Sequence, residues 1–69
     1  SQEGNSLELL KNMKDSLQKN QYRLFTAMAL LKLGRVQTGI NILKDVIDFF
    51  PADAVEGRIA TWMMDEYQR

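Results

Sequence analysis

The chain of 69 residues and 8.0 kDa is long enough for one small domain, and it leaves little room for a large enclosed active site. It contains no His and no Cys, which excludes imidazole acid–base chemistry, thiol nucleophiles, disulfide bonds and the usual zinc sites. Nine Lys and Arg balance nine Asp and Glu, so the chain lacks the net positive charge of most nucleic-acid-binding domains.

The first segment has the spacing of an amphipathic helix. Asn5 or Ser6, followed by Glu8, resembles a capping box. Apolar residues then recur every three or four positions, at Leu7, Leu10, Met13 and Leu17. We therefore expect a first helix that fades near Lys19, preceded by a tail over residues 1–5 that is left from processing or from a longer protein.

A second helix is expected from Asn20, as its N-cap, to Gly34. Glycine fits the end of the helix because it adopts the left-handed conformation without steric cost. Apolar residues lie on nearly every side of this segment, and such a helix must be covered on more than one side. They are Tyr22, Leu24, Phe25, Ala27, Met28, Ala29, Leu30, Leu31 and Leu33.

Two further helices complete the chain. The third is expected over Val36–Phe50, because Pro51 disfavours helical geometry in the residue before it. Asp53, with Glu56 three residues later, predicts a capping box for a last helix over 54–68. No segment shows the alternation of a half-buried strand. The sequence predicts a single all-α domain over 1–69 with about four short antiparallel helices.

The middle of the chain resembles a tetratricopeptide repeat. The run from Asn20 to Asp53 has that unit's length of 34 residues. Within it Gly34 ends the first helix, Gly39 and Leu43 form a small-x3-bulky pair, and Pro51 follows twelve residues after Gly39. A small residue at position 39 lets the second helix of the unit approach the first closely. An ordinary antiparallel helical bundle remains the alternative architecture.

The resemblance implies a helical scaffold that binds a protein or peptide in a groove lined by the first helix of each unit. The positions that would line this groove are Leu24, Met28, Leu31, Arg58, Trp62 and Asp65. The groove would be mainly apolar, which suits an amphipathic helix or an extended peptide with hydrophobic anchors. The alternative for Trp62 is a place in the core.

These features favour a non-catalytic protein-interaction module, an adaptor or small chaperone-like domain without cofactors or metals. Asp45 and Asp48 lie on one helix face, and we interpret them as solvated rather than catalytic. The main alternative is a homo-oligomerisation domain that buries its surplus apolar surface against a second copy. A helix-turn-helix that binds DNA is a distant third, because the candidate recognition helix carries one Lys against two Asp.

Charge and hydropathy bear on partners and location. Residues 1–35 carry six basic and three acidic residues, net +3, and residues 36–69 carry three basic and six acidic residues, net −3. This polarity is compatible with charge-complementary association or with ordinary solvated helix faces.

The longest uncharged run, Leu24–Leu31, is eight residues, too short for a membrane span. With no secretory signal and no Cys, we expect a cytoplasmic protein.

Overall fold

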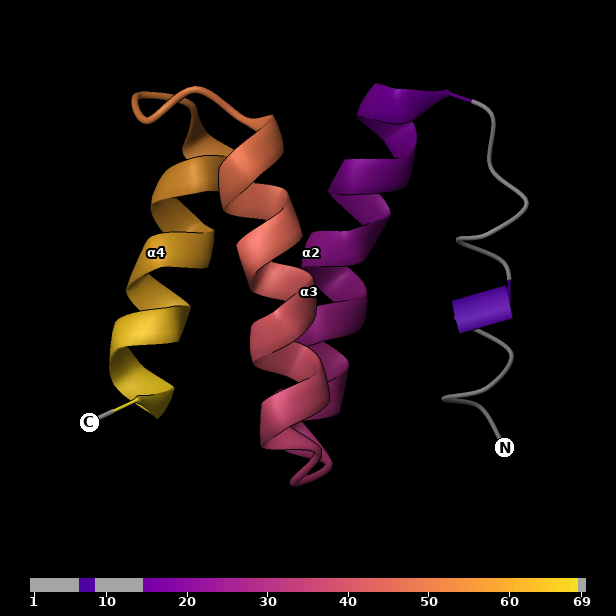
Figure 1. The fold of residues 1–69 in the computed structure, drawn as a ribbon, viewed down its shortest axis with the longest axis vertical. Helices are drawn as coiled ribbons and strands as arrows, with labels where there is room; N and C mark the ends of the chain where they lie inside the picture. The colour runs from indigo at the N-terminus through magenta and orange to yellow at the C-terminus, as the bar shows by residue number, and fades with distance from the viewer. Residues whose placement is uncertain (1–6, 9–14, 69) are drawn as a thin grey trace.

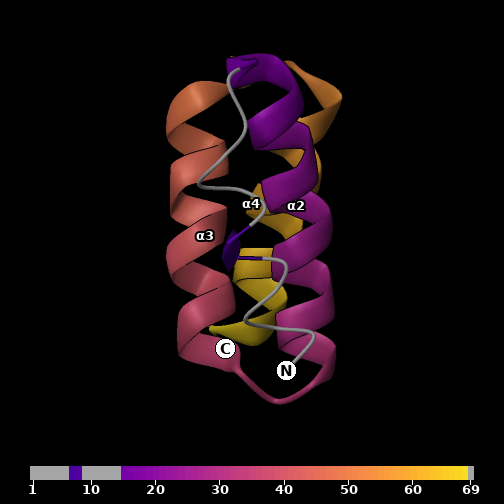
Figure 2. The same ribbon diagram turned by 90° about the vertical axis from the view of Figure 1, so that its right-hand side faces the viewer.

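The computed structural model describes residues 7–8 and 15–68, and within the second range the chain forms three α-helices (Figure 1). Consecutive helices are antiparallel, so α2 and α4 run in the same direction, and α3 packs against both (Figures 1 and 2). The all-α class is confirmed. The helices are α2 over Ser16–Lys32, α3 over Val36–Phe49 and α4 over Val55–Tyr67.

The predicted number of about four helices is not confirmed. Leu7 and Glu8 are helical, but the remainder of the first predicted helix up to residue 14 lies outside the described residues, as does the predicted tail. The predicted break between Lys19 and Asn20 is wrong, because α2 begins four residues before Asn20, at Ser16.

Two side chains explain why α2 begins where it does. The N-cap is Asp15, whose Oδ1 accepts a hydrogen bond of 2.9 Å from the amide of Gln18. Asn20 is buried within the helix, where its Nδ2 donates to the Ser16 carbonyl at 2.8 Å and its Oδ1 accepts from Arg23 at 3.0 Å. Its polar groups are therefore satisfied without a helix break.

The turn between α2 and α3 agrees with the prediction. Gly34 has φ +84°, the left-handed geometry expected of a helix C-terminus. The amide of Arg35 donates to the Leu30 carbonyl at 2.8 Å, and the amide of Gly34 donates to the Leu31 carbonyl at 3.1 Å, so the last carbonyls of α2 are satisfied. The turn is short and forces α3 to return along α2.

The connection between α3 and α4 agrees at one end and differs at the other. Phe50 is extended and ends α3 just before Pro51, as predicted. The predicted capping box of Asp53 and Glu56 is wrong: the N-cap of α4 is Ala54, and no side chain caps it. The Ala54 amide instead donates to the Pro51 carbonyl at 3.0 Å, so the turn places Asp53 one residue too early to cap the helix.

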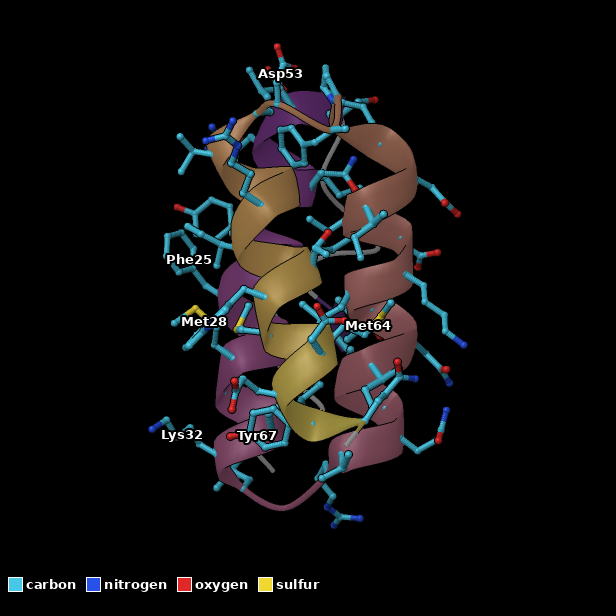
Figure 3. All side chains as sticks on the ribbon, turned by 90° about the vertical axis from the view of Figure 1, so that its left-hand side faces the viewer. Phe25, Met28, Lys32, Asp53, Met64 and Tyr67 are labelled. Carbon is cyan, nitrogen blue, oxygen red and sulfur yellow. The ribbon has the colours of Figure 1, made fainter. Side chains whose placement is uncertain are left out.

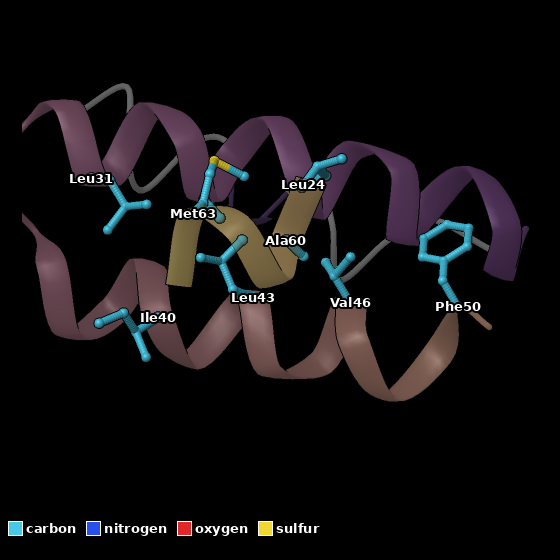
Figure 4. Packing of buried hydrophobic residues seen from close by; sticks show 9 residues of the cluster. Leu24, Leu31, Ile40, Leu43, Val46, Phe50, Ala60 and Met63 are labelled. Carbon is cyan, nitrogen blue, oxygen red and sulfur yellow. The ribbon is translucent and has the colours of Figure 1, made fainter. Parts of the chain in front are cut away.

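The core lies where the three helices meet (Figure 4). Helix α3 supplies the centre of it, with Leu43 and Val46 fully buried. The remaining buried apolar residues of this cluster come from α2 (Leu24, Ala27 and Leu31), from the rest of α3 (Ile40 and Phe50) and from α4 (Ala60 and Met63).

Helices α2 and α3 approach each other closely at Gly39. A Cβ atom at this position would lie 2.9 Å from Leu31 Cγ and 3.3 Å from the Ala27 carbonyl oxygen. Both distances are shorter than ordinary van der Waals contact, so only glycine fits without a shift of α2. The predicted role of a small residue at position 39 is confirmed.

Replacing Gly39 with alanine is expected to lower the free energy of unfolding by about 1–2 kcal/mol. Overpacking against Leu31 costs roughly 1–3 kcal/mol, and the better helix propensity of alanine offsets up to about 1 kcal/mol. Urea denaturation followed by circular dichroism measures the difference. The control is Thr38→Ala, an exposed neighbour on the same helix, which should leave stability unchanged or slightly raised. A stabilised Gly39→Ala variant would contradict the close approach.

Candidate functional site

An apolar surface runs between α2 and α4. Ten large hydrophobic side chains of the described residues are exposed, and seven of them line two concavities between these helices. We call these seven residues the α2–α4 face: Tyr22, Phe25, Met28, Val55, Ile59, Trp62 and Tyr67. A monomeric protein rarely exposes so large a contiguous apolar patch without a binding function.

The first concavity lies between the N-terminal halves of α2 and α4 and has a volume of about 630 Å³. Its walls are Tyr22 and Phe25 on one side and Val55 and Ile59 on the other, with the buried Leu24 beneath them. At its edge Gln21 Nε2 donates to Glu56 Oε2 at 3.3 Å. This hydrogen bond joins α2 to α4 and shows that Gln21 and Glu56 lie at the same level of the two helices.

The second concavity continues the first toward the C-terminal ends of the two helices, with a volume of about 410 Å³. Met28 belongs to both concavities, and Trp62 and Tyr67 form the opposite wall of the second. Figure 3 shows Phe25, Met28 and Lys32 projecting from the same side of α2, with Tyr67 of α4 level with Lys32. The two concavities form one groove, apolar along its walls and polar at its ends.

The structure divides the six residues predicted to line a groove into three groups. Met28 and Trp62 are exposed at 40% and 64% and belong to the α2–α4 face. Leu24 and Leu31 are only 5% and 4% exposed, so they form the floor of the groove and belong mainly to the core.

Arg58 and Asp65 make up the third group and lie away from this groove. They line a separate concavity of about 480 Å³ between α3 and α4, with Ile47 and Phe50 on its α3 side. Trp62 stands on the ridge of α4 between the two surfaces and contributes to both. The six predicted residues are therefore not brought together on a single surface.

Five residues of the α2–α4 face were not predicted to line a groove: Tyr22, Phe25, Val55, Ile59 and Tyr67. A helix that is apolar on all sides is expected to bury most of its apolar residues, yet Phe25 is 63% exposed. The excess of apolar residues in α2 was the sequence signal that could have found the groove. The core buries Leu24, Ala27 and Leu31, and the apolar residues on the adjacent face of α2 are left exposed.

Two kinds of polar feature are absent from the described residues. These residues contain no group of three acidic side chains close enough to hold a metal ion, and none of their buried side-chain polar atoms lacks a hydrogen-bond partner. Over the same residues, no helix has both the length and the apolar character needed to cross a bilayer. The chemistry that this surface supports best is apolar contact.

Comparison of the chain with protein-family models, with curated proteins and with solved structures found no match.

Trp62→Ala and Met63→Ala test the assignment of neighbouring residues to surface and core. Trp62 is 64% exposed, so its removal is expected to change the free energy of unfolding by less than about 1 kcal/mol. Met63 is 5% exposed, and Met63→Ala is expected to cost about 2–4 kcal/mol because it leaves a cavity. Denaturant titration monitored by circular dichroism compares the two. Equal losses would mean that Trp62 contributes to the core.

Proposed function

We propose that this protein is a non-catalytic interaction module that binds a protein or peptide on the α2–α4 face. The observation that carries the proposal is the exposure of seven large apolar side chains along one groove. The core is complete without them, because the buried cluster is formed by other residues of the same helices. Their exposure is costly in water and is relieved when a partner covers them.

The shape of the groove supports a helical or extended partner. Its two walls are helices that run in the same direction, and α4 with its 13 residues spans about 20 Å along the helix axis. A helix of similar length places apolar side chains at helical spacing along such a groove. Aromatic residues and Met28 provide adaptable, large contact surfaces on the receiving side.

The same proposal includes a tetratricopeptide-like arrangement of the three helices. In a tetratricopeptide-like arrangement, α2 and α3 form one helical hairpin and α4 is the first helix of a following unit or a capping helix. The close approach at Gly39 and the parallel course of α2 and α4 support this arrangement. The role as an adaptor or small chaperone-like module in the cytoplasm is part of the proposal as well.

The experiment uses a displayed library of 15- to 20-residue peptides, selected against the immobilised full chain and then titrated in solution. Trp62 is the only tryptophan, so its fluorescence reports directly on the α2–α4 face. We expect selected amphipathic peptides to shift Trp62 emission to shorter wavelengths as the indole ring leaves water. Phe25→Glu is expected to weaken their binding about tenfold or more, because it places a charge in the apolar wall.

Leu33→Glu is the matched control. Leu33 is 67% exposed and lines neither concavity of the groove, so the same introduction of a carboxylate should leave peptide binding within about twofold of the original. Selected peptides that bind equally to Phe25→Glu, or a selection against the monomeric chain that yields no peptide able to shift Trp62 emission, would contradict the proposal.

A further inference from the structure

The size of the α2–α4 face fits a protein interface of ordinary dimensions. Its four aromatic side chains, Tyr22, Phe25, Trp62 and Tyr67, are exposed at 43%, 63%, 64% and 41%. With the three aliphatic ones they offer roughly 600 Å² of side-chain surface, given that a buried aromatic residue covers about 150–250 Å². A stable complex buries about 800 Å² on each partner, so this face with its polar edges is large enough for one.

The two helices that form the face carry opposite charge. Helix α2 contains Lys19, Arg23 and Lys32 and no acidic residue, which gives +3. Helix α4 contains Glu56, Asp65 and Glu66 against Arg58, which gives −2. Of these charged residues, those that line the groove are Lys32 on α2 and Glu56 and Glu66 on α4. The two walls of the groove therefore carry opposite charge, and the α2–α4 face is complementary to itself.

Only one orientation of a symmetric dimer brings the oppositely charged helices together. A two-fold axis parallel to the helices lays α2 of one copy on α4 of the other, and each residue keeps its level along the axis. Positive then meets negative on both sides of the groove. A two-fold axis across the helices lays α2 on α2 and α4 on α4, where like charges oppose each other.

We propose that a second copy of this chain covers the α2–α4 face, packed about a two-fold axis parallel to α2 and α4. This inference rests on the proposed function, because it names the partner of the same surface. Apolar contact supplies the affinity, and the charges on the two helices select the orientation. Lys32, which lies at the C-terminal end of the groove with Glu66, faces the C-terminal end of α4 of the second copy.

The first measurement is the mass of the full chain by sedimentation equilibrium over a concentration series, with Trp62 emission recorded at each concentration. We expect a reversible dimer whose formation shifts the emission to shorter wavelengths. Phe25→Glu is expected to weaken dimerisation about tenfold or more, and Leu33→Glu to leave it within about twofold. A dimer that is equally sensitive to both variants, or insensitive to Phe25→Glu, overturns the inference.

Disulfide cross-linking determines the orientation of the two copies. The chain has no Cys, so Phe25→Cys and Ile59→Cys each introduce a single thiol, and both positions line the same concavity. In the proposed packing, position 25 of one copy faces position 59 of the other. Mild oxidation of a mixture should therefore give mainly the mixed disulfide dimer. Efficient cross-linking of Phe25→Cys with itself would place α2 on α2 and overturn the inference.

Charge reversal gives a second test of the same orientation. Lys32→Glu is expected to weaken dimerisation about three- to tenfold at low salt, because the change occurs twice in a symmetric dimer. Combining it with Glu66→Lys in one chain restores the attraction and is expected to recover most of the loss. A double variant that is weaker than both single variants overturns the inference.

The outcomes separate this inference from the function on which it rests. A chain that stays monomeric at high concentration but binds selected peptides in a Phe25-dependent way retains the proposed function and overturns the second copy as partner. A monomer that binds no such peptide overturns both.

Discussion

The close approach of α2 and α3 at Gly39 is the constraint on which the remaining packing depends. Any side chain there would meet Leu31 and the Ala27 carbonyl, so the separation of the two helices is set by the absence of one. At this separation α3 covers one side of α2 and buries Leu24, Ala27 and Leu31. Ala60 and Met63 of α4 also pack into the core that α3 forms. Because α3 packs against both α2 and α4, these two helices form the two walls of a groove.

The chain has more apolar surface than three short helices can enclose. Hydrophobic residues make up 45% of the sequence, and a domain of this size leaves a large share of its surface exposed. Much of the excess is gathered along one groove, which seven of the ten exposed large hydrophobic side chains of the described residues line, whereas Lys44, Asp45 and Asp48 lie exposed on α3. The α2–α4 face therefore differs from the rest of the surface in its many exposed apolar side chains.

Much of the fold follows from local sequence signals. Gly34, Gly39 and Pro51 act through backbone geometry or the lack of a Cβ, so the end of α2, the helix contact and the end of α3 were predictable. The signals that failed were polar residues with several possible partners. Asn20 resembled a cap but is satisfied inside α2, and Asp53 resembled a cap but belongs to a turn. For the site, Met28 and Trp62 are exposed and are two of the groove positions that the resemblance to a tetratricopeptide repeat implies. The floor and walls of the groove depend on how far α3 reaches around α2, which the sequence alone does not specify.

Helix α4 is held less firmly than the hairpin beside it. No side chain caps its first turn, it buries only Gly57, Ala60 and Met63, and it packs mainly on α3 with few contacts to α2. Local unfolding of such an element requires less free energy than unfolding of the whole domain. We therefore expect the backbone amides of α4 to exchange with solvent hydrogen faster than those of α2 and α3. Opening of α4 alone would remove Ala60 and Met63 from the core and leave the apolar side chains of α2 and α3 that they cover in contact with water.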